Sequence, residues 1–383
     1  MIVLWTNPES YLEWFENNFK HLYTEVNLCD HSSDMWESNY HKEGSVLNHT
    51  RLVLGEAIKD TDKVLLHIAA LLHDIGKPYC RNIKENSDKV VFYDHDNYSA
   101  YLAIDVIKKY YESIDDPLNS HNLVEILYLI NYHMLRIKNK KISNIYDVNN
   151  FFGFGKSFDN NFVKMLHYDN VGRKAEKEYL DFRDSLNLAH DLETADIPDF
   201  EYDIEYKKNS LIYRNKNSTK FSNNSEGANL TLLMGIPASG KTTYSEKLKE
   251  NGYKVFCRDD VIMELGAFDE YDKNWKTVNQ EEVSRIHENR IKDGIKNEED
   301  LVIDETNMSI KSRNRKINLL HNRYLKSVNI KVFLLSLEEV LKRNSNRSDT
   351  GKYITPKVYE KMLKNFQMPV FSEGFNEIEF IFE

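Results

Sequence analysis

Apolar side chains recur at every third or fourth position through most of the segment 1–190. The clearest stripe runs from Val46 through Val53 to Ala57. A spacing near 3.6 residues places such side chains on one face of a helix. The stretch 64–72 is apolar on nearly every side, which is typical of a helix at the centre of a bundle. The pattern therefore predicts an all-α region built around this buried helix.

The pattern changes after residue 228, where short apolar runs alternate with helical stretches. Four runs are expected to form buried parallel strands: 230–234, 254–257, 301–303 and 329–335. Strands that alternate with helices predict an α/β domain with a parallel sheet. The segment before them is acidic at first and then rich in Asn, Ser, Lys and Gly, which is typical of a linker.

The chain is thus predicted to contain two domains, as its 383 residues also suggest. The expected boundaries are 1–190 for the all-α domain, 191–227 for the linker and 228–383 for the α/β domain. Two short strand-like runs inside the linker, 204–206 and 211–213, are not assigned to either domain.

The formal net charge is −10, and the acidic excess lies mainly in the segment 1–190. This argues against broad, nonspecific binding of nucleic acid, so any such contact must be local. No apolar run reaches the length of a membrane span, and the segment 1–20 lacks the basic start of a signal peptide. The three cysteines lack disulfide or zinc spacing, which is typical of reduced thiols in a cytoplasmic protein.

The central helix is expected to end on the adjacent pair His73 and Asp74. Neighbouring residues on a helix point about 100° apart, so the two side chains can converge only where the helix stops. An imidazole nitrogen beside a carboxylate oxygen is typical of a divalent-metal site. Gly76 is expected to turn the chain with a positive φ, and Pro78 to prevent the helix from resuming. Lys77 would direct a cation at whatever the metal binds.

Other predicted helices supply further ligand candidates. His49 lies beside the apolar stripe of its helix, and Asp169 lies on the inner face of another helix, with Arg173 one turn later. A buried carboxylate needs a metal or a partner charge to offset its desolvation. The predicted metal ligands are therefore His49, His73, Asp74 and Asp169.

The remaining histidines divide into two groups. His95 and His133 could bind a second metal or act as an acid, and His41 is a weaker candidate. The others are interpreted as ordinary core or surface residues: His21, His31, His67, His121, His167 and His190.

Residues 235–242 read GIPASGKT, which matches the phosphate-loop pattern GxxxxGK[ST] between an apolar strand and a helix. Backbone N–H groups and the helix N-terminus cradle phosphates in such loops. Lys241 is expected to neutralise β/γ oxygens and Thr242 to coordinate Mg²⁺. The predicted nucleotide-binding residues of the loop are Gly235, Ser239, Gly240, Lys241, Thr242 and Thr243.

Carboxylates follow two of the predicted strands, at the edge where α/β sheets bind ligands. Asp259 and Asp260 follow the second strand, and Asp304 follows the next. One of the paired aspartates could take the proton from an attacking hydroxyl while the other caps the next helix. Arg343 and Arg347 are spaced i, i+4 on a predicted helix, so they could close together over a γ-phosphate or form a solvated helix face.

The first set of residues resembles the HD phosphohydrolase superfamily, whose pattern is H…HD…D with further histidines between. The resemblance covers most of 40–175, from the HKEG run at 41–44 to the DNVGR run at 169–173. It implies a mostly helical domain that hydrolyses phosphate esters with one or two metals, and Mn, Ni, Co or Zn suits the ligands. Lys77 and Arg173 are expected to hold phosphate oxygens.

Residues 230–370 resemble the 5′-polynucleotide kinases of phages and bacterial RNA-repair systems. The resemblance is carried by the phosphate loop, by 258–260, by 304–307 and by the KRNSNR run at 342–347. It implies that Asp259 is the general base and that Arg347 contacts the nucleotide phosphates. The family often has an arginine at the position of Ile262. Either another cation such as Arg313 or Arg315 serves instead, or the acceptor is held differently.

An HD domain ahead of such a kinase resembles the bifunctional HD-Pnk RNA end-healing enzymes. The resemblance implies removal of a 2′,3′-cyclic, 2′- or 3′-phosphate, and transfer of phosphate from ATP or another NTP with Mg²⁺ to the 5′-hydroxyl of RNA or DNA ends. A separate RNA ligase would join the healed ends. Two alternatives stay open: a small-molecule kinase joined to an HD nucleotidase, and a non-catalytic nucleotide sensor. The presence of Asp259 argues against the sensor, because a switch needs no acceptor-side base.

Overall fold

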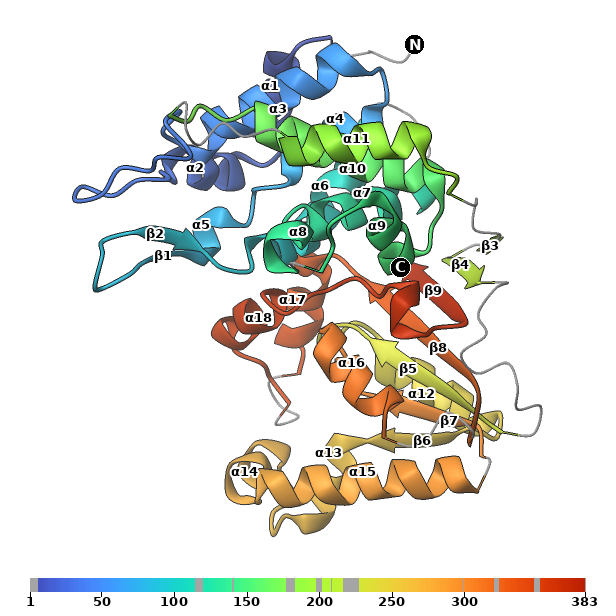
Figure 1. The fold of residues 1–383 in the computed structure, drawn as a ribbon. Helices are drawn as coiled ribbons and strands as arrows, with labels where there is room; N and C mark the ends of the chain where they lie inside the picture. The colour runs from blue at the N-terminus through green and yellow to red at the C-terminus, as the bar shows by residue number, and fades with distance from the viewer. Residues whose placement is uncertain are drawn as a thin grey trace. The chain divides into compact units, whose positions relative to one another are not determined.

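The computed structural model of the chain divides into two compact units, drawn in Figure 1. The first comprises Met1–Asp199 with Leu363–Met368, and the second Phe200–Met362 with Pro369–Glu383. The structure describes residues 6–113, 120–139, 141–176, 183–197, 202–207, 209–215, 227–297, 299–319, 324–347 and 352–382. Within these ranges, no helix has both the length and the apolar character needed to cross a bilayer.

The first unit is helical, as the apolar pattern predicted. Its helices are α1 (Pro8–Asn18), α2 (Lys20–Leu28), α3 (Val46–Asp60), α4 (Val64–Leu72), α5 (Lys77–Cys80), α6 (His95–Ser113), α7 (Ser120–Tyr132), α8 (Leu135–Lys138), α9 (Ile145–Phe152), α10 (Lys156–Val171) and α11 (Arg183–Thr194). A hairpin of β1 (Arg81–Ile83) and β2 (Val90–Phe92) interrupts them. The pattern did not predict this hairpin, because most of its side chains are exposed and show no apolar alternation.

Helix α4 is the centre of the first unit. The side chains from Ile68 to Leu72 are buried on every side, and α4 contacts α3, α6, α7 and α10. This confirms the prediction of a central buried helix. Because four helices surround α4, residues at its C-terminal end face side chains that are far away in the sequence.

The segment Leu363–Met368 completes the first unit. Phe366 is buried, with its ring edge-on to Tyr101 of α6 at 5.1 Å between centroids. Asn131 of α7 donates from Nδ2 to the Phe366 carbonyl (2.8 Å) and accepts from the Met368 N–H (2.7 Å). A short segment near the end of the chain therefore contributes to the core of the N-terminal unit.

The second unit is an α/β fold with a seven-stranded sheet. The strands are β3 (Tyr202–Lys207), β4 (Ser210–Asn215), β5 (Ala228–Met234), β6 (Lys254–Cys257), β7 (Leu301–Asp304), β8 (Leu325–Leu334) and β9 (Glu377–Phe382), in the order β3-β4-β9-β8-β5-β7-β6. The pairs from β9 to β6 are parallel, and β3 and β4 add as an antiparallel edge. The helices are α12 (Lys241–Glu250), α13 (Arg258–Leu265), α14 (Tyr271–Thr277), α15 (Gln280–Lys296), α16 (Ile310–Ile317), α17 (Leu337–Ser345) and α18 (Pro356–Leu363), with a 3₁₀ turn η4 (Phe371–Glu373).

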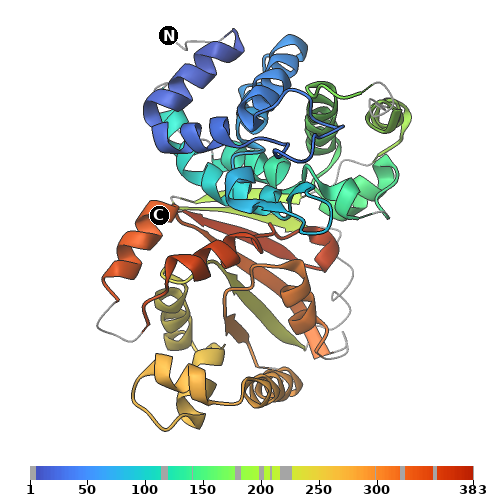
Figure 2. The same ribbon diagram turned by 90° about the vertical axis from the view of Figure 1, so that its left-hand side faces the viewer.

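Helices cover both faces of this sheet, as Figure 2 shows. Leu248 of α12 packs on a cluster that includes Val302. Gly294 of α15 approaches Leu301, so a Cβ at residue 294 would meet its side chain at 2.9 Å. Successive residues of a strand point to opposite faces, so α12 and α15 lie on opposite sides of the sheet. The sheet is consequently buried on both faces, which explains the continuous apolar runs of its parallel strands.

Part of the expected linker 191–227 is ordered structure. Its strand-like runs form β3 and β4, and β4 pairs with β9, a strand that the sequence analysis did not identify. Leu211 and Ile212 of β4 are buried, so this edge of the sheet needs the segment before residue 228. The stretch 216–226, also expected to be linker, lies outside the described residues.

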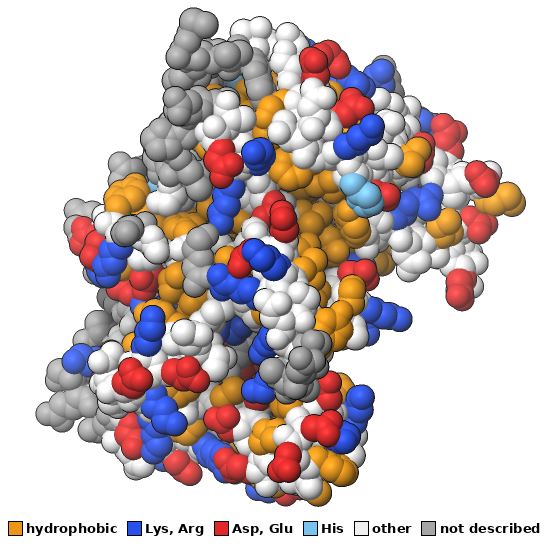
Figure 3. Space-filling view, turned by 180° about the vertical axis from the view of Figure 1, so that it is seen from behind, with side chains coloured by type: hydrophobic (Ala, Val, Ile, Leu, Met, Phe, Trp, Pro, Cys, Tyr) orange, Lys and Arg blue, Asp and Glu red, His pale blue; other side chains and the backbone are white. Residues whose placement is uncertain are grey.

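Charged side chains of both signs are mixed on one face of the molecule. On the face drawn in Figure 3, basic and acidic side chains are interspersed over each unit. Such a surface agrees with the expectation that any contact with nucleic acid is local.

Candidate functional site

The His73–Asp74 pair lies where helix α4 ends, as predicted. His73 is the C-terminal cap of α4, and both side chains are buried. The expectations for the next residues were wrong. Gly76 has φ −83°, and Pro78 lies in the first turn of α5, which begins at once because a proline needs no N–H partner there. Glycine is required at residue 76 for space, since a Cβ would lie 2.6 Å from the His95 carbonyl oxygen.

Four buried histidines present the same ring nitrogen to the centre of the site. The Nδ1 atoms of His73, His95 and His133 lie 2.7–2.8 Å from carbonyl oxygens of Ala70, Phe92 and Ile130. A carbonyl only accepts, so each Nδ1 carries the hydrogen and each Nε2 presents a lone pair. The fourth histidine, His49, has its Nδ1 3.0 Å from Glu43 Oε1. Such outer partners typically orient histidines that bind metals.

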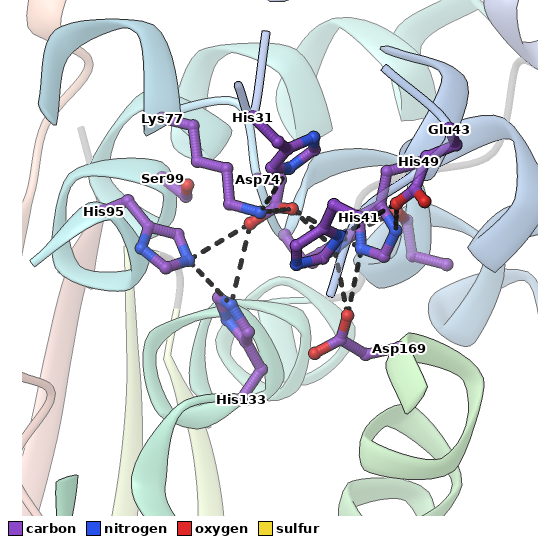
Figure 4. Close-up of polar contacts among 12 residues, drawn as sticks. His31, His41, Glu43, His49, Asp74, Lys77, His95, Ser99, His133 and Asp169 are labelled. Carbon is purple, nitrogen blue, oxygen red and sulfur yellow. Dashed lines mark hydrogen bonds and ion pairs between the residues drawn. The ribbon is translucent and has the colours of Figure 1, made fainter. Parts of the chain in front are cut away.

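The Nε2 atoms converge on two carboxylates, as Figure 4 shows. Asp74 Oδ2 lies 3.1 Å from His73 Nε2 and 3.6 Å from His49 Nε2. Asp169 Oδ1 lies 3.0 Å from His49 Nε2 and 3.8 Å from His73 Nε2. On the other side, Asp74 Oδ1 lies 3.1 Å from His95 Nε2 and 3.7 Å from His133 Nε2. Asp74 therefore joins two adjacent donor groups.

These donors fit divalent metal ions. The sets His49–His73–Asp169 and Asp74–His95–His133 each bring three ligand atoms within 4.8 Å of one another. His95 Nε2 and His133 Nε2 are 3.1 Å apart, and two lone pairs at that distance need a proton or a cation between them. Both oxygens of Asp74 are buried, and their near neighbours are imidazole nitrogens and the Lys77 ammonium group. Imidazole nitrogens with carboxylate oxygens are a usual ligand set for Mn, Ni, Co and Zn.

The protonation equilibria of the cluster reflect its buried charges. Burial opposes ionisation of Asp74, but His73 and Lys77 outweigh it and hold the pKa of Asp74 well below its usual range. Burial likewise opposes protonation of His49, yet the carboxylates of Asp169 and Glu43 raise its pKa to about 9. Burial lowers the pKa of His133 to about 4. Near pH 7 the Asp74 carboxylate is therefore charged and His133 is neutral, as metal ligands must be, whereas His49 holds a proton that a bound metal would displace.

The two predicted phosphate-binding cations lie at the cluster. Lys77 Nζ lies 2.6 Å from Asp74 Oδ2 and 3.0 Å from His31 Nε2. Arg173 lines a cavity of about 700 Å³ that opens beside Asp74 and Asp169. Contrary to expectation, Arg173 does not share a helix with Asp169, because α10 ends at Val171.

The sequence analysis did not assign a role at this site to His31 or Glu43, and it treated His41 as a weaker candidate. His31 donates from Nδ1 to the Gly44 carbonyl (2.9 Å), so its Nε2 accepts from Lys77 and orients it. Glu43 lies between His49 and His41, at 3.0 and 2.8 Å. No helical stripe marks these residues, because they lie in the loop between α2 and α3. The HKEG run at 41–44 indicated His41 and Glu43 through the family resemblance, and nothing in the sequence indicated His31.

The phosphate loop has the strand–loop–helix context that its pattern predicts. Gly235 follows β5, and Gly240, with φ +97°, precedes α12. A Cβ at residue 235 would lie 2.6 Å from Ser239 Oγ, so the loop needs glycine there. Lys241 is buried, and its Nζ donates to the Ile236 carbonyl (3.0 Å). Thr242 and Thr243 are exposed in the first turn of α12.

Strand register gathers the predicted acidic residues at the edge that holds the phosphate loop. Asp304 pairs with Leu233 of β5 on one side and with Cys257 of β6 on the other. Asp304 Oδ2 accepts from Ser245 Oγ of α12 (2.9 Å), and Asp259 Oδ1 accepts from the Tyr271 hydroxyl (2.8 Å). The predicted aspartate cap is wrong, because α13 begins at Arg258, directly after the strand, and Cys257 is its N-cap. Both aspartates lie in the first turn.

Positive charge also gathers at this edge. Burial lowers the pKa of Lys241 to about 8; nearby Asp304 opposes this shift and Arg347 adds to it. Arg347 therefore lies close enough to Lys241 to influence it. The expectation that Arg343 and Arg347 share a helical face was wrong, because α17 ends at Ser345. Arg343 instead pairs with Glu339 on its own helix (2.9 Å).

The structure bears on the two candidates for an acceptor-side cation, Arg313 and Arg315. Ile262 is fully buried beside Val261 and Val283, so that position faces the core rather than a ligand. Arg313 is also fully buried, and its guanidinium donates to both oxygens of Glu373 at 2.8 Å. It cannot reach an acceptor. Arg315 lines a separate pocket and pairs with Glu288.

Comparison with protein families agrees with this organisation. Residues 46–196 match the model of the HD domain, and residues 230–369 match a model of the AAA domain. The first match contains every predicted metal ligand of the helical unit, and the second contains the phosphate loop, Asp259 and Arg347. The chain therefore contains an HD domain followed by a P-loop domain.

Two curated proteins are similar to parts of the chain. The "Bifunctional polynucleotide phosphatase/kinase" of Schizosaccharomyces pombe is 25% identical over 238 residues, which are 58% of this chain and 52% of that protein. The "Putative bifunctional polynucleotide kinase/RNA ligase" of Autographa californica nuclear polyhedrosis virus is 28% identical over 148 residues, 36% of this chain and 20% of that protein. The chain thus spans about half the length of one relative and a fifth of the other.

Among solved structures, the Pnkp1/Rnl/Hen1 RNA repair complex contains a similar chain. It is 26% identical, and the match covers 37% of this chain and 45% of that chain with a TM-score of 0.31.

Proposed function

We propose that the chain heals RNA ends with two separate activities. Its helical unit removes a 2′,3′-cyclic, 2′- or 3′-phosphate from one end, and its P-loop unit transfers a γ-phosphate to a 5′-hydroxyl. The observation that carries the proposal is the pair of donor groups joined by Asp74, in one chain with a phosphate loop and Asp259. The names of the two curated relatives, which join a polynucleotide kinase to a second activity, support it.

The helical unit supplies the groups that hydrolysis of a phosphate ester requires. The ligand atoms of His49, His73 and Asp169 would hold one divalent ion, and those of Asp74, His95 and His133 a second. A bound ion of this kind lowers the pKa of water and polarises the phosphate. Lys77 and Arg173 place cations at the same cavity and would neutralise phosphate oxygens as negative charge builds up.

The P-loop unit supplies the groups for phosphoryl transfer. Backbone N–H groups of residues 235–241 and the charged Lys241 side chain would hold the β- and γ-phosphates of ATP or another NTP. Thr242 and Asp304 would hold Mg²⁺. Asp259 would accept the proton of the attacking 5′-hydroxyl, and Tyr271 fixes its orientation. Arg347 would neutralise phosphate oxygens beside Lys241.

An assay on one RNA that carries both a 5′-hydroxyl and a 2′,3′-cyclic phosphate tests the proposal. The purified chain should release or open the 3′ phosphate with a divalent transition metal and label the 5′ end from γ-labelled ATP with Mg²⁺. Lys241→Ala should abolish labelling and preserve phosphate release, and His73→Ala should do the reverse. A folded variant that loses both activities together would contradict two independent sites.

The same assay separates the alternatives. Labelling of a small alcohol but not of the 5′-hydroxyl RNA would favour a small-molecule kinase joined to a nucleotidase. Turnover of neither substrate class by protein that binds ATP would favour the nucleotide sensor. If both ends are healed, a separate RNA ligase should seal the products, and DNA ends can be compared directly with RNA ends.

A further inference from the structure

The metal-ligand cluster lines one side of the cavity of about 700 Å³. The side chains on the other side have no role in the proposed hydrolysis, and we call them the wall. Trp36 and Tyr40 line the cavity from the loop between α2 and α3, and Tyr93 lines it at the end of β2. Lys84 and Lys89 line it from the β1–β2 hairpin. Tyr93 is 62% exposed, so much of this aromatic side chain is open to solvent.

The two segments of this wall are tied together. Arg81 donates to the Asp30 carbonyl (3.2 Å) and to the Ser32 carbonyl (2.8 Å). Ser33 Oγ donates to the Asp88 carbonyl (3.0 Å), which links the loop to the hairpin turn. Figure 1 shows the hairpin beside α5 in the first unit. The loop and the hairpin thus form one structure rather than two independent loops.

Each lysine of the wall lies over an aromatic ring. Lys84 Nζ is 5.7 Å from the centre of Tyr93, and Lys89 Nζ is 5.9 Å from the centre of Trp36. Aromatic faces stack on nucleobases, and lysines beside them neutralise the phosphates that join nucleosides. A small phosphate ester without an aromatic ring would gain nothing from the stacking surface.

The cavity has room for such a ligand. Its volume of about 700 Å³ lies within the range of sites for drug-sized ligands. The cluster with Lys77 and Arg173 forms one part of the lining, and the aromatic and basic wall forms another. A phosphate at the cluster would leave the attached sugar and base to extend along the wall.

We propose that this wall, defined by Trp36, Tyr40, Lys84, Lys89 and Tyr93, is a nucleoside subsite that binds the terminal nucleotide of a polynucleotide 3′ end. The aromatic rings stack on its base, and the two lysines hold the phosphate that joins it to the strand. The inference rests on the proposed phosphoesterase activity. It adds that the helical unit selects polynucleotide ends over small phosphate esters.

Kinetics on two substrates test the selection. One substrate is a short RNA with a 2′,3′-cyclic phosphate, and the other is glycerol 1,2-cyclic phosphate, which has the same five-membered cyclic diester but no aromatic ring. Trp36→Ala and Tyr93→Ala should each lower the ratio of kcat/KM for RNA to that for the small ester by about 10-fold, and Trp36→Phe should retain most of it. Tyr146→Ala, which removes an exposed tyrosine of α9 outside the cavity, is the control. Equal losses on both substrates would overturn the proposal.

Binding gives a readout that does not depend on turnover. The full chain is titrated, in EDTA and without ATP, into the same RNA with a fluorophore blocking its 5′ end, and anisotropy is recorded over a range of salt. Replacing Lys84 and Lys89 with alanine should weaken binding and reduce the slope of log Kd against log salt by about 1. Replacing Lys59 and Lys109, two lysines of α3 and α6 outside the cavity, is the control. Unchanged binding after loss of the wall lysines and Trp36 would overturn the subsite.

These measurements separate the two proposals. If the unaltered chain hydrolyses neither substrate with any divalent metal, the proposed phosphoesterase fails, and anisotropy alone decides whether the wall binds RNA. If the chain hydrolyses both substrates but the wall variants keep the same ratio and affinity, the phosphoesterase stands and the nucleoside subsite fails.

Discussion

The two sites of this chain are built in opposite ways. The phosphate loop is one continuous segment, 235–242, whose ligand-binding groups are mostly backbone N–H groups. The His/Asp cluster draws its ligand atoms from positions 49 to 169, on or directly after five helices, α3, α4, α6, α7 and α10. The phosphate loop depends on one local backbone conformation. The His/Asp cluster depends on several buried charges that neutralise one another. Local substitutions should therefore disable the loop directly, whereas the cluster should respond to residues that touch no substrate.

The largest effect is expected for Asp74→Asn, because both donor groups share this carboxylate. Phosphate release should fall by at least about 10³-fold, and bound metal measured by mass spectrometry should fall with it. The 5′ kinase activity of the same preparation should be unchanged. Asp96→Asn is a matched control, since Asp96 is a buried carboxylate of α6 that pairs with Lys138 at 2.6 Å outside the donor groups. An equal loss in the control would show that the cluster tolerates no nearby buried substitution.

The phosphate loop is continuous in sequence, but the strand before it is linked by hydrogen bonds to the buried residue Arg313. Arg313 donates to the Asn307 carbonyl (3.0 Å), and Asn307 Nδ2 donates to the Leu233 carbonyl of β5 (2.8 Å). Arg313→Met leaves the Glu373 carboxylate buried without the guanidinium that neutralises it, so the second unit should lose about 3–5 kcal/mol. Hydrogen exchange of peptides from β5 and α12 over a urea series measures this. Arg315→Met should have little effect, since that side chain is mostly exposed.

Asp159 is a buried carboxylate whose pKa is shifted in the opposite direction to that of Asp74, because no cation in the described part of the chain neutralises it. Burial raises the pKa of Asp159 to about 7, and among the described residues Asn149 alone donates a hydrogen bond to its carboxylate (2.6 Å). The folded chain therefore binds this proton more tightly than the unfolded chain, and stability falls as pH rises from about 4 to about 7. Asp159→Asn should be more stable than the unaltered chain above pH 7, by up to about 4 kcal/mol, and the difference should vanish below about pH 4.

The control for this pH dependence has the opposite sign. Hydrogen bonds from Ser143 and the backbone of Asn144 lower the pKa of Asp147, which caps α9. Its contribution to stability should be present above about pH 4 and lost as pH falls. Asp147→Asn should therefore be less stable than the unaltered chain at neutral pH. Thermal unfolding across pH distinguishes the two cases, and parallel shifts in both variants would contradict the assignment for Asp159.

The smallest effect is expected for Glu43→Gln, which leaves every ligand atom in place. Glu43 orients His49 from the outside, so metal affinity measured by calorimetry should fall by about 10-fold. Glu37→Gln changes an exposed carboxylate of the same loop and should leave the affinity unchanged. If Glu43→Gln binds metal normally, the cluster does not depend on its outer partners, and the contrast with the phosphate loop weakens.

Much of the fold was predictable from apolar periodicity. The central helix 64–72 and the four parallel strands carry strong local signals, because buried positions along them must be apolar. The β1–β2 hairpin, with its exposed side chains, and β9 were not identified. The strands β3 and β4 could not be assigned, because their partner β9 lies at the far end of the sequence.

The sequence alone determined the phosphate loop and the list of metal-ligand candidates. Spacing and residue type are sufficient where a site is one segment or where a buried histidine and aspartate stand at a helix end. Only the tertiary structure decided that Asp74 joins two donor groups, that His31 and Glu43 orient Lys77 and His49, and that Arg313 serves the core. These depend on which helix ends meet around α4 and on which buried charges neutralise each other. Both are properties of packing between distant segments, and no local pattern of residues encodes them.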